Sequence, residues 1–118
     1  MSNMPNVDMP KPGMPSGALA MLILRVLNSG ALHGYAIAQR IQEKSGDLLR
    51  AEEGSLYPAL QRLLIEGWVS AAWGLSARKR RVRIYTLTAA GRKQLNRETK
   101  RVGRLIDGIA RVMRPSEI

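Results

Sequence analysis

Adjacent cations form the most densely charged stretch of the chain. They are Arg78, Lys79, Arg80 and Arg81, and Arg83 follows two positions later. Such a run repels itself in isolation, and it is stabilised when a polyanion lies against it and releases condensed counterions. The chemistry that this pattern indicates is the binding of phosphates.

A second group of polar residues lies on one side of the segment EEGSLYPALQRLLIEGW, from Glu52 to Trp68. Leucines recur on the other side at three- and four-residue steps, so the segment is predicted to be an amphipathic helix. Glutamine can pair bidentately with adenine, and arginine with guanine. The polar group is either a DNA-reading surface or an ordinary solvated face, and it comprises Ser55, Tyr57, Pro58, Gln61 and Arg62.

The charge of the whole chain supports a polyanionic partner. Its 118 residues include 19 Lys and Arg against nine Asp and Glu, which gives a formal charge of +10 and an isoelectric point near 11.1. This balance predicts nucleic acid as the first partner and an anionic membrane surface as the second. The length fits one domain. The absence of cysteine excludes disulfides and thiolate metal sites.

Residues suited to catalysis are scarce. His33 is the only histidine, and its place beside Gly34 at the start of a predicted helix favours capping or packing. Glu52 and Glu53 are neighbours that point apart on most backbones, and no glycine-rich phosphate loop accompanies them. We therefore expect no enzyme activity, no metal site and no cofactor.

Three helices are predicted ahead of the strands. The first begins at Ser16, whose hydroxyl is a candidate N-cap, and it is apolar almost all round. The second covers residues 34–44. The third is assigned an N-cap at Ser55, which places Pro58 in the first turn, where its missing amide costs no hydrogen bond.

A β-hairpin is predicted next, from Trp68–Trp73 and Arg81–Thr88, two segments of strand-like composition. The cation run falls in the loop between them and is the expected tip. The sequence leaves open whether Val82 and Ile84 or the alternate residues of the second strand face the core.

A long last helix is predicted from Ala89, capped by Thr88, through Met113. A basic amphipathic helix either lies on an anionic membrane or pairs with a second copy of itself. Its apolar side has no Trp or Phe, and the longest apolar run of the chain is too short to span a bilayer. We therefore expect a cytoplasmic protein without membrane association. The predicted dimer interface comprises Leu19, Leu22, Ile23, Val102, Leu105, Ile106, Ile109, Val112 and Met113.

Three blocks of the sequence, HGYAIAQRI, EEGSLYPALQRLLIEGWV and RRVRIYTLTAAGRKQL, resemble the DNA-binding domain of the PadR family of bacterial transcriptional regulators. The resemblance implies a mainly α fold with a small β-hairpin. Residues 16–88 are then a winged helix-turn-helix domain, and residues 89–118 a C-terminal dimerisation helix. Residues 1–15 are expected to be a flexible arm, because they hold four prolines and show no periodicity. The resemblance further implies a homodimeric repressor, or less often an activator, that binds an operator with two-fold symmetry and is released by a small effector.

The resemblance also assigns roles to residues. The third helix matches the recognition helix, and Gly74 to Arg83 matches the wing. In the second helix, Tyr35 and Gln39 are assigned to the DNA-facing surface. Drug-binding members of the family place a tryptophan on the last helix, which this chain lacks, and any effector is expected at the dimer interface. The alternative that stays open is an architectural DNA-binding protein with little preference for sequence.

Overall fold

The computed structural model describes residue 14 and residues 17–116. Its elements are α1 (Ala18–Leu27), β1 (Leu32–His33), α2 (Gly34–Lys44), α3 (Glu53–Glu66), β2 (Val69–Leu75), β3 (Arg81–Leu87) and α4 (Ala89–Met113). The predicted order of three helices, a hairpin and a long helix is confirmed. The predicted Ser16 cap and most of the predicted N-terminal arm lie outside the described residues.

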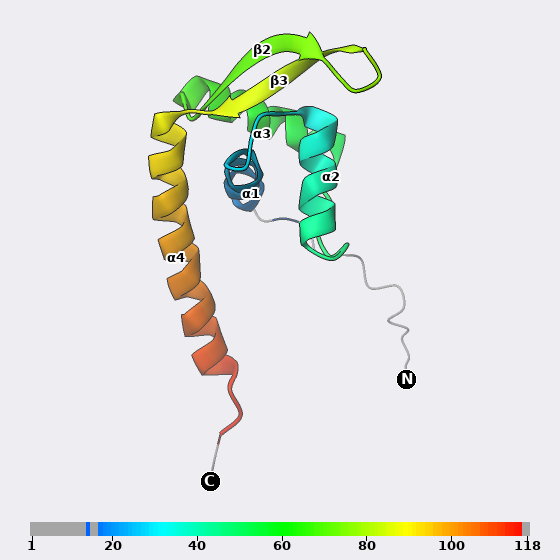
Figure 1. Ribbon diagram of the computed structural model, residues 1–118. Helices are drawn as coiled ribbons and strands as arrows, with labels where there is room; N and C mark the ends of the chain where they lie inside the picture. The colour runs from blue at the N-terminus through cyan, green and yellow to red at the C-terminus, as the bar shows by residue number, and fades with distance from the viewer. Residues whose placement is uncertain (1–13, 15–16, 117–118) are drawn as a thin grey trace, which may run out of the picture.

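The core lies where the three short helices meet the base of the sheet. Figure 1 shows α1 between α2 and α4, with the β2–β3 hairpin crossing one end of the helices. Apolar side chains of α1 are buried on several sides, which accounts for a helix that is apolar almost all round. The largest fully buried side chains are Ile23, Leu24, Ile37, Leu56, Leu60, Leu63 and Leu95.

The sheet has three antiparallel strands in the order β1-β3-β2, where only the hairpin was predicted. The additional strand β1 has two residues, and Leu32 lies opposite Tyr85 in β3. In β3, Tyr85 and Leu87 are buried, while Val82 and Ile84 are half-buried on the opposite face. The phase that the sequence left open is therefore settled at the base of the hairpin, where the odd-numbered residues face the core.

The start of α3 differs from the prediction. The helix begins at Glu53, because the amides of Ser55 and Leu56 bond to the Glu52 carbonyl at 3.0 and 2.8 Å. The prediction that Ser55 is the N-cap is therefore wrong, and Pro58 is the sixth helical residue. At that position proline does remove an intrahelical hydrogen bond, the one to the carbonyl of Gly54.

The start of α4 was predicted correctly. The Thr88 hydroxyl accepts a hydrogen bond from the Gly91 amide at 3.0 Å and donates one to the Gly67 carbonyl at 2.7 Å. Gly91 itself is buried against Trp68, just before β2, and the last residue of β3. A Cβ atom there would overlap the Trp68 carbonyl oxygen and lie 2.7 Å from Cδ1 of Leu87. This close approach fixes the position at which α4 leaves the domain.

Replacing Gly91 with alanine should therefore destabilise the protein. Overpacking against main chain typically costs about 1–3 kcal/mol, and we expect a loss of that size in urea unfolding followed by circular dichroism. The matched control is Gly54→Ala, because a Cβ atom on Gly54 meets open space, and it should leave stability equal or slightly higher. Equal unfolding midpoints for Gly91→Ala and the wild type would contradict the docking of α4 described above.

Candidate nucleic-acid interface

The third helix presents a polar face on its side away from the core. Its apolar residues Leu56, Ala59, Leu60 and Leu63 are buried, which confirms the predicted division of the helix. The exposed residues of this helix include all five predicted DNA contacts, namely Ser55, Tyr57, Pro58, Gln61 and Arg62.

These five residues do not all point the same way. Successive helical residues are turned by about 100°, so Gln61 lies one turn beyond Tyr57 on the outer face. Ser55 and Arg62 lie on the flank nearer α1, where they line a cleft of about 360 Å³ with Ala20. Arg62 also borders a second cleft, of about 250 Å³, that extends to α4. Of the two predicted base contacts, Arg62 therefore faces the flank toward α1 and α4, whereas Gln61 shares the outer face with Tyr57.

The first turn of α2 lies against the first half of α3. The hydroxyl oxygen of Tyr57 is 2.9 Å from the position that a Cβ atom on Gly34 would take, so the close contact depends on that glycine. Tyr35 and Gln39 are exposed beside it, and both line a cleft of about 460 Å³ together with Tyr57. The structure thus brings together the predicted DNA-facing residues of the two helices.

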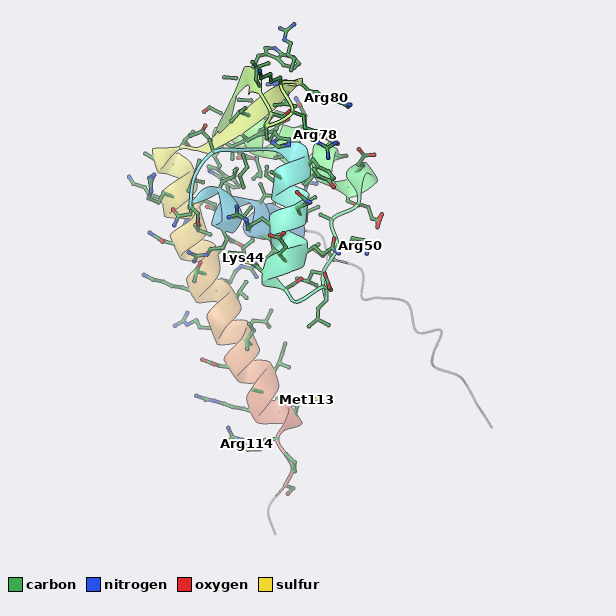
Figure 2. All side chains as sticks on the ribbon, turned by 45° about the vertical axis from the view of Figure 1, so that its right-hand side comes forward. Lys44, Arg50, Arg78, Arg80, Met113 and Arg114 are labelled. Carbon is green, nitrogen blue, oxygen red and sulfur yellow. The ribbon has the colours of Figure 1, made fainter. Side chains whose placement is uncertain are left out.

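The tip run, defined as Arg78, Lys79 and Arg80, lies in the β2–β3 turn and is exposed. The amides of Lys79 and Ser76 bond to the carbonyls of Ser76 and Arg80, both at 2.8 Å, and Lys79 is left-handed with φ 61°. The two arginines line a cleft of about 520 Å³ with Tyr35 and Gln39. Figure 2 shows Arg78 and Arg80 at the end of the molecule where the tip overlies the start of α2.

The charges of this surface are largely uncompensated by neighbouring acids. Within the described residues the one ion pair is that of Glu98 with Arg101, 2.8 Å apart and remote from the tip run. That hydrogen bond, aided by Coulomb attraction, raises the pKa of Arg101 above its ordinary value. Two carboxylates, Glu52 and Glu53, stand at the start of α3. They oppose the binding of a phosphate at that helix end.

One exposed aromatic residue was not recognised as part of the site. Trp73 in β2 is 60% exposed, and the guanidinium carbon of Arg81 lies 4.5 Å from its ring centroid. Trp73 had been placed only as a strand residue. The sequence did contain a signal for it. Trp73 ends the first predicted strand of the hairpin, and in the second strand Arg81 and Arg83 alternate with Val82.

The last helix contacts the domain with its first half only. Gly91 and Leu95 are its buried residues, and the side chain of Arg25 in α1 donates a hydrogen bond to the Thr99 hydroxyl at 3.0 Å. Beyond this point α4 extends away from the other elements (Figure 1). Its exposed apolar stripe, hereafter the α4 stripe, consists of Leu105, Ile106, Ile109, Val112 and Met113.

The predicted interface residues of the first helix need correction. Ile23 is 0% exposed and Leu19 is 7% exposed in a single chain. Both belong to the core of the domain, so they have almost no surface to offer a partner. Leu22 and Val102 are half-buried.

The described residues contain no helix long and apolar enough to cross a bilayer. In the same part of the chain, no group of three or more metal-ligating side chains lies close enough to hold an ion.

The sequence of this chain is similar to those of known transcriptional regulators. The model of the PadR-like family of transcriptional regulators matches residues 23–97. The negative transcriptional regulator PadR of Bacillus subtilis is 32% identical over 78 residues, which are 66% of this chain and 43% of that protein. The chain spans less than half the length of the curated relatives that it matches.

Solved structures share the fold as well as the sequence pattern. A transcriptional regulator from Clostridium thermocellum superposes with a TM-score of 0.76 at 25% identity, covering 84% of this chain and 96% of that one. PadR of Bacillus subtilis in complex with operator DNA gives a TM-score of 0.62 at 27% identity, over 88% of this chain and 51% of that one. The family match spans more than half of the sequence, including α2, α3 and the hairpin, and the chain belongs to the PadR-like family of transcriptional regulators.

Proposed function

We propose that this protein is a sequence-specific repressor that binds an operator of two-fold symmetry as a homodimer. The observation that carries the proposal is the placement of two surfaces at opposite ends of the molecule. The α3 face and the tip run lie at one end, and the α4 stripe lies at the other. The relative from Bacillus subtilis is a negative regulator whose structure was solved with operator DNA, which supports the same role here. A regulator of this kind acts on DNA in the cytoplasm.

Pairing of α4 with a second copy accounts for the α4 stripe. The helix has 25 residues and a length of about 37 Å, and all five residues of the stripe are more than half exposed. Two-fold pairing buries the same stripe on both chains and leaves their cations outside. Val102, one turn before the stripe, is half-buried in the single chain, as is Leu22 of α1, and we include both in the interface.

The DNA contacts divide into base reading and phosphate binding. Gln61, on the outer face of α3, is suited to adenine, and Arg62 on the flank is suited to guanine or to a nearby phosphate. Tyr35, Gln39 and Tyr57 line the cleft between α2 and α3 and lie beside these base contacts. The hairpin cations bind the flanking phosphates.

A small effector held at the dimer interface releases the operator in this proposal. Both half-sites are engaged only when the two recognition helices are about one helical repeat of DNA, 34–36 Å, apart. Since α4 packs on the base of the hairpin and on α1, a ligand near that junction changes the separation of the two α3 helices.

The proposal predicts a strong preference for one sequence. A palindrome upstream of the protein's own reading frame or of a neighbouring operon is the first segment to footprint. At physiological salt, binding to the protected segment should be about 10³-fold or more tighter than to random duplex of equal length. A ratio near one would instead identify the architectural, sequence-tolerant DNA-binding protein.

A further inference from the structure

Trp73 occupies the point where one face of the hairpin passes from the core into solvent. Val69 in β2 and, across the ladder, Tyr85 and Leu87 in β3 are buried at the base of this face. Trp73 follows on the same face, opposite Arg83, and is 60% exposed. The face therefore continues beyond the core as a surface that holds a large aromatic ring in solvent.

Two guanidinium groups lie against this ring. The Cζ atom of Arg81 is 4.5 Å from the ring centroid of Trp73, and that of Arg83 is 5.7 Å away. Arg83 is also 6.0 Å from the ring of Tyr85. Attraction between a cation and an aromatic ring restricts the rotamers of both arginines. Among the described residues neither arginine has a carboxylate within ion-pair distance, so both charges are available to an outside anion.

These inner arginines, Arg81 and Arg83, form a group separate from the tip run. Together with Trp73 they line a cleft of about 300 Å³ whose other wall includes Tyr57 of α3 and Tyr35 of α2. The arginines of the tip run line a different cleft, over the first turns of α2. The hairpin thus carries one cationic group at its tip and one on its inner face, beside the start of α3.

We infer that Trp73 is a positioning residue for DNA binding: its ring holds the inner arginines beside α3, where they bind phosphates bordering the groove that this helix occupies. The inference rests on the proposed function, because a duplex lying along α3 brings phosphates to this cleft. An arginine that is already restrained by a ring loses less rotamer freedom when it binds a phosphate. Trp73, although uncharged, therefore strengthens the contact between the inner arginines and the phosphates.

Trp73→Leu keeps an apolar side chain and removes the ring. Operator binding should weaken roughly five- to twentyfold, as expected when two long side chains are ordered on binding instead of beforehand. The slope of log K against log salt concentration should also flatten, although no charge has been removed. Trp73→Phe restores a ring and should recover most of both effects. Titrations of a labelled duplex at three salt concentrations measure these quantities, and the slope change should appear on random duplex too, because phosphates carry no sequence information.

A double-mutant cycle separates positioning from general damage to the hairpin. The effects of Trp73→Leu and Arg81→Gln should be clearly less than additive, because both remove the same contact. Trp73→Leu and Arg78→Gln should be additive, because Arg78 belongs to the tip run. Additivity in both pairs, or a wild-type salt slope for Trp73→Leu, overturns the inference.

A second measurement leaves the hairpin intact. The chain has two tryptophans, so Trp68→Phe makes Trp73 the sole indole fluorophore. Bound duplex should shield that indole from acrylamide, and unchanged quenching overturns the inference. A wild type without operator preference refutes the proposed function, yet quenching and salt slope stay measurable on random duplex. Operator preference combined with wild-type behaviour of Trp73→Leu refutes the inference alone.

Discussion

The double substitution Ile106→Glu and Ile109→Glu should convert the protein from a dimer into a monomer of 13.1 kDa and weaken operator binding at least about a hundredfold. Both side chains are more than half exposed in the single chain, and burying carboxylates between two α4 helices is strongly unfavourable. Two linked half-sites typically gain a factor of about 10² to 10⁴ over one, and that factor is lost with the dimer. Light scattering and operator titration measure the two effects.

The control for this experiment is Ile106→Leu with Ile109→Leu, which keeps the stripe apolar and should keep the dimer. The urea unfolding of the glutamate variant should resemble that of a dilute wild-type sample, because this half of α4 lies beyond the buried residues Gly91 and Leu95. A wild-type protein that scatters as a stable monomer at micromolar concentration would contradict the proposed assembly. So would a glutamate variant that remains dimeric.

The order of the elements could be predicted because most of them carry a local signal. Thr88 precedes a periodic apolar segment, and its hydroxyl does accept from the Gly91 amide. The buried side of α3 follows from the spacing of its leucines, and four of its apolar residues are in the core. The hairpin follows from two segments of strand-like composition, the second of them rich in β-branched residues, that flank a polar, basic turn. In each case the residues that form the structure are close together in sequence.

Features that depend on distant or main-chain partners could not be predicted in the same way. Strand β1 has two residues, too few for any periodicity, and it exists because Leu32 pairs with Tyr85 far along the chain. The first turn of α3 is closed by the Glu52 carbonyl, so the hydroxyl of Ser55 is not needed as a cap. A sequence motif for capping predicts only those helix starts that use a side chain.

The sequence predicted which residues belong to the site. Only the structure shows which of them face DNA and which face another part of the protein. Periodicity places Gln61 and Arg62 on the polar side of α3 without showing that α1 lies next to Arg62. Leu19, Leu22 and Ile23 of α1 were predicted to lie in a dimer interface, whereas α1 is central within one domain and buries Ile23 completely. Faces of a helix can be derived from spacing, but the neighbour that covers each face depends on the packing of the whole chain.

The outward position of Gln61 leads to the sharpest test of sequence recognition. Gln61→Ala should cost about 1–3 kcal/mol on the operator, the value of a good bidentate contact with a base, and should leave binding to random duplex nearly unchanged. Glutamine is uncharged, so the salt slope should also keep its wild-type value. Titrations on both duplexes at two salt concentrations measure this. The matched control is Gln94→Ala, since Gln94 lies on α4 and bonds to Glu98 and Arg97.

The opposite pattern is expected for the tip run. Changing Arg78, Lys79 and Arg80 to alanine should weaken binding to operator and random duplex alike and flatten the salt slope by about 0.9 for each lost phosphate contact. Removing three exposed cations of α4, Lys100, Arg104 and Arg111, lowers the net charge equally and should leave the slope nearly unchanged. If Gln61→Ala also weakened both duplexes equally, the outer face of α3 would contact only the backbone, and α3 would lose its assignment as the recognition helix.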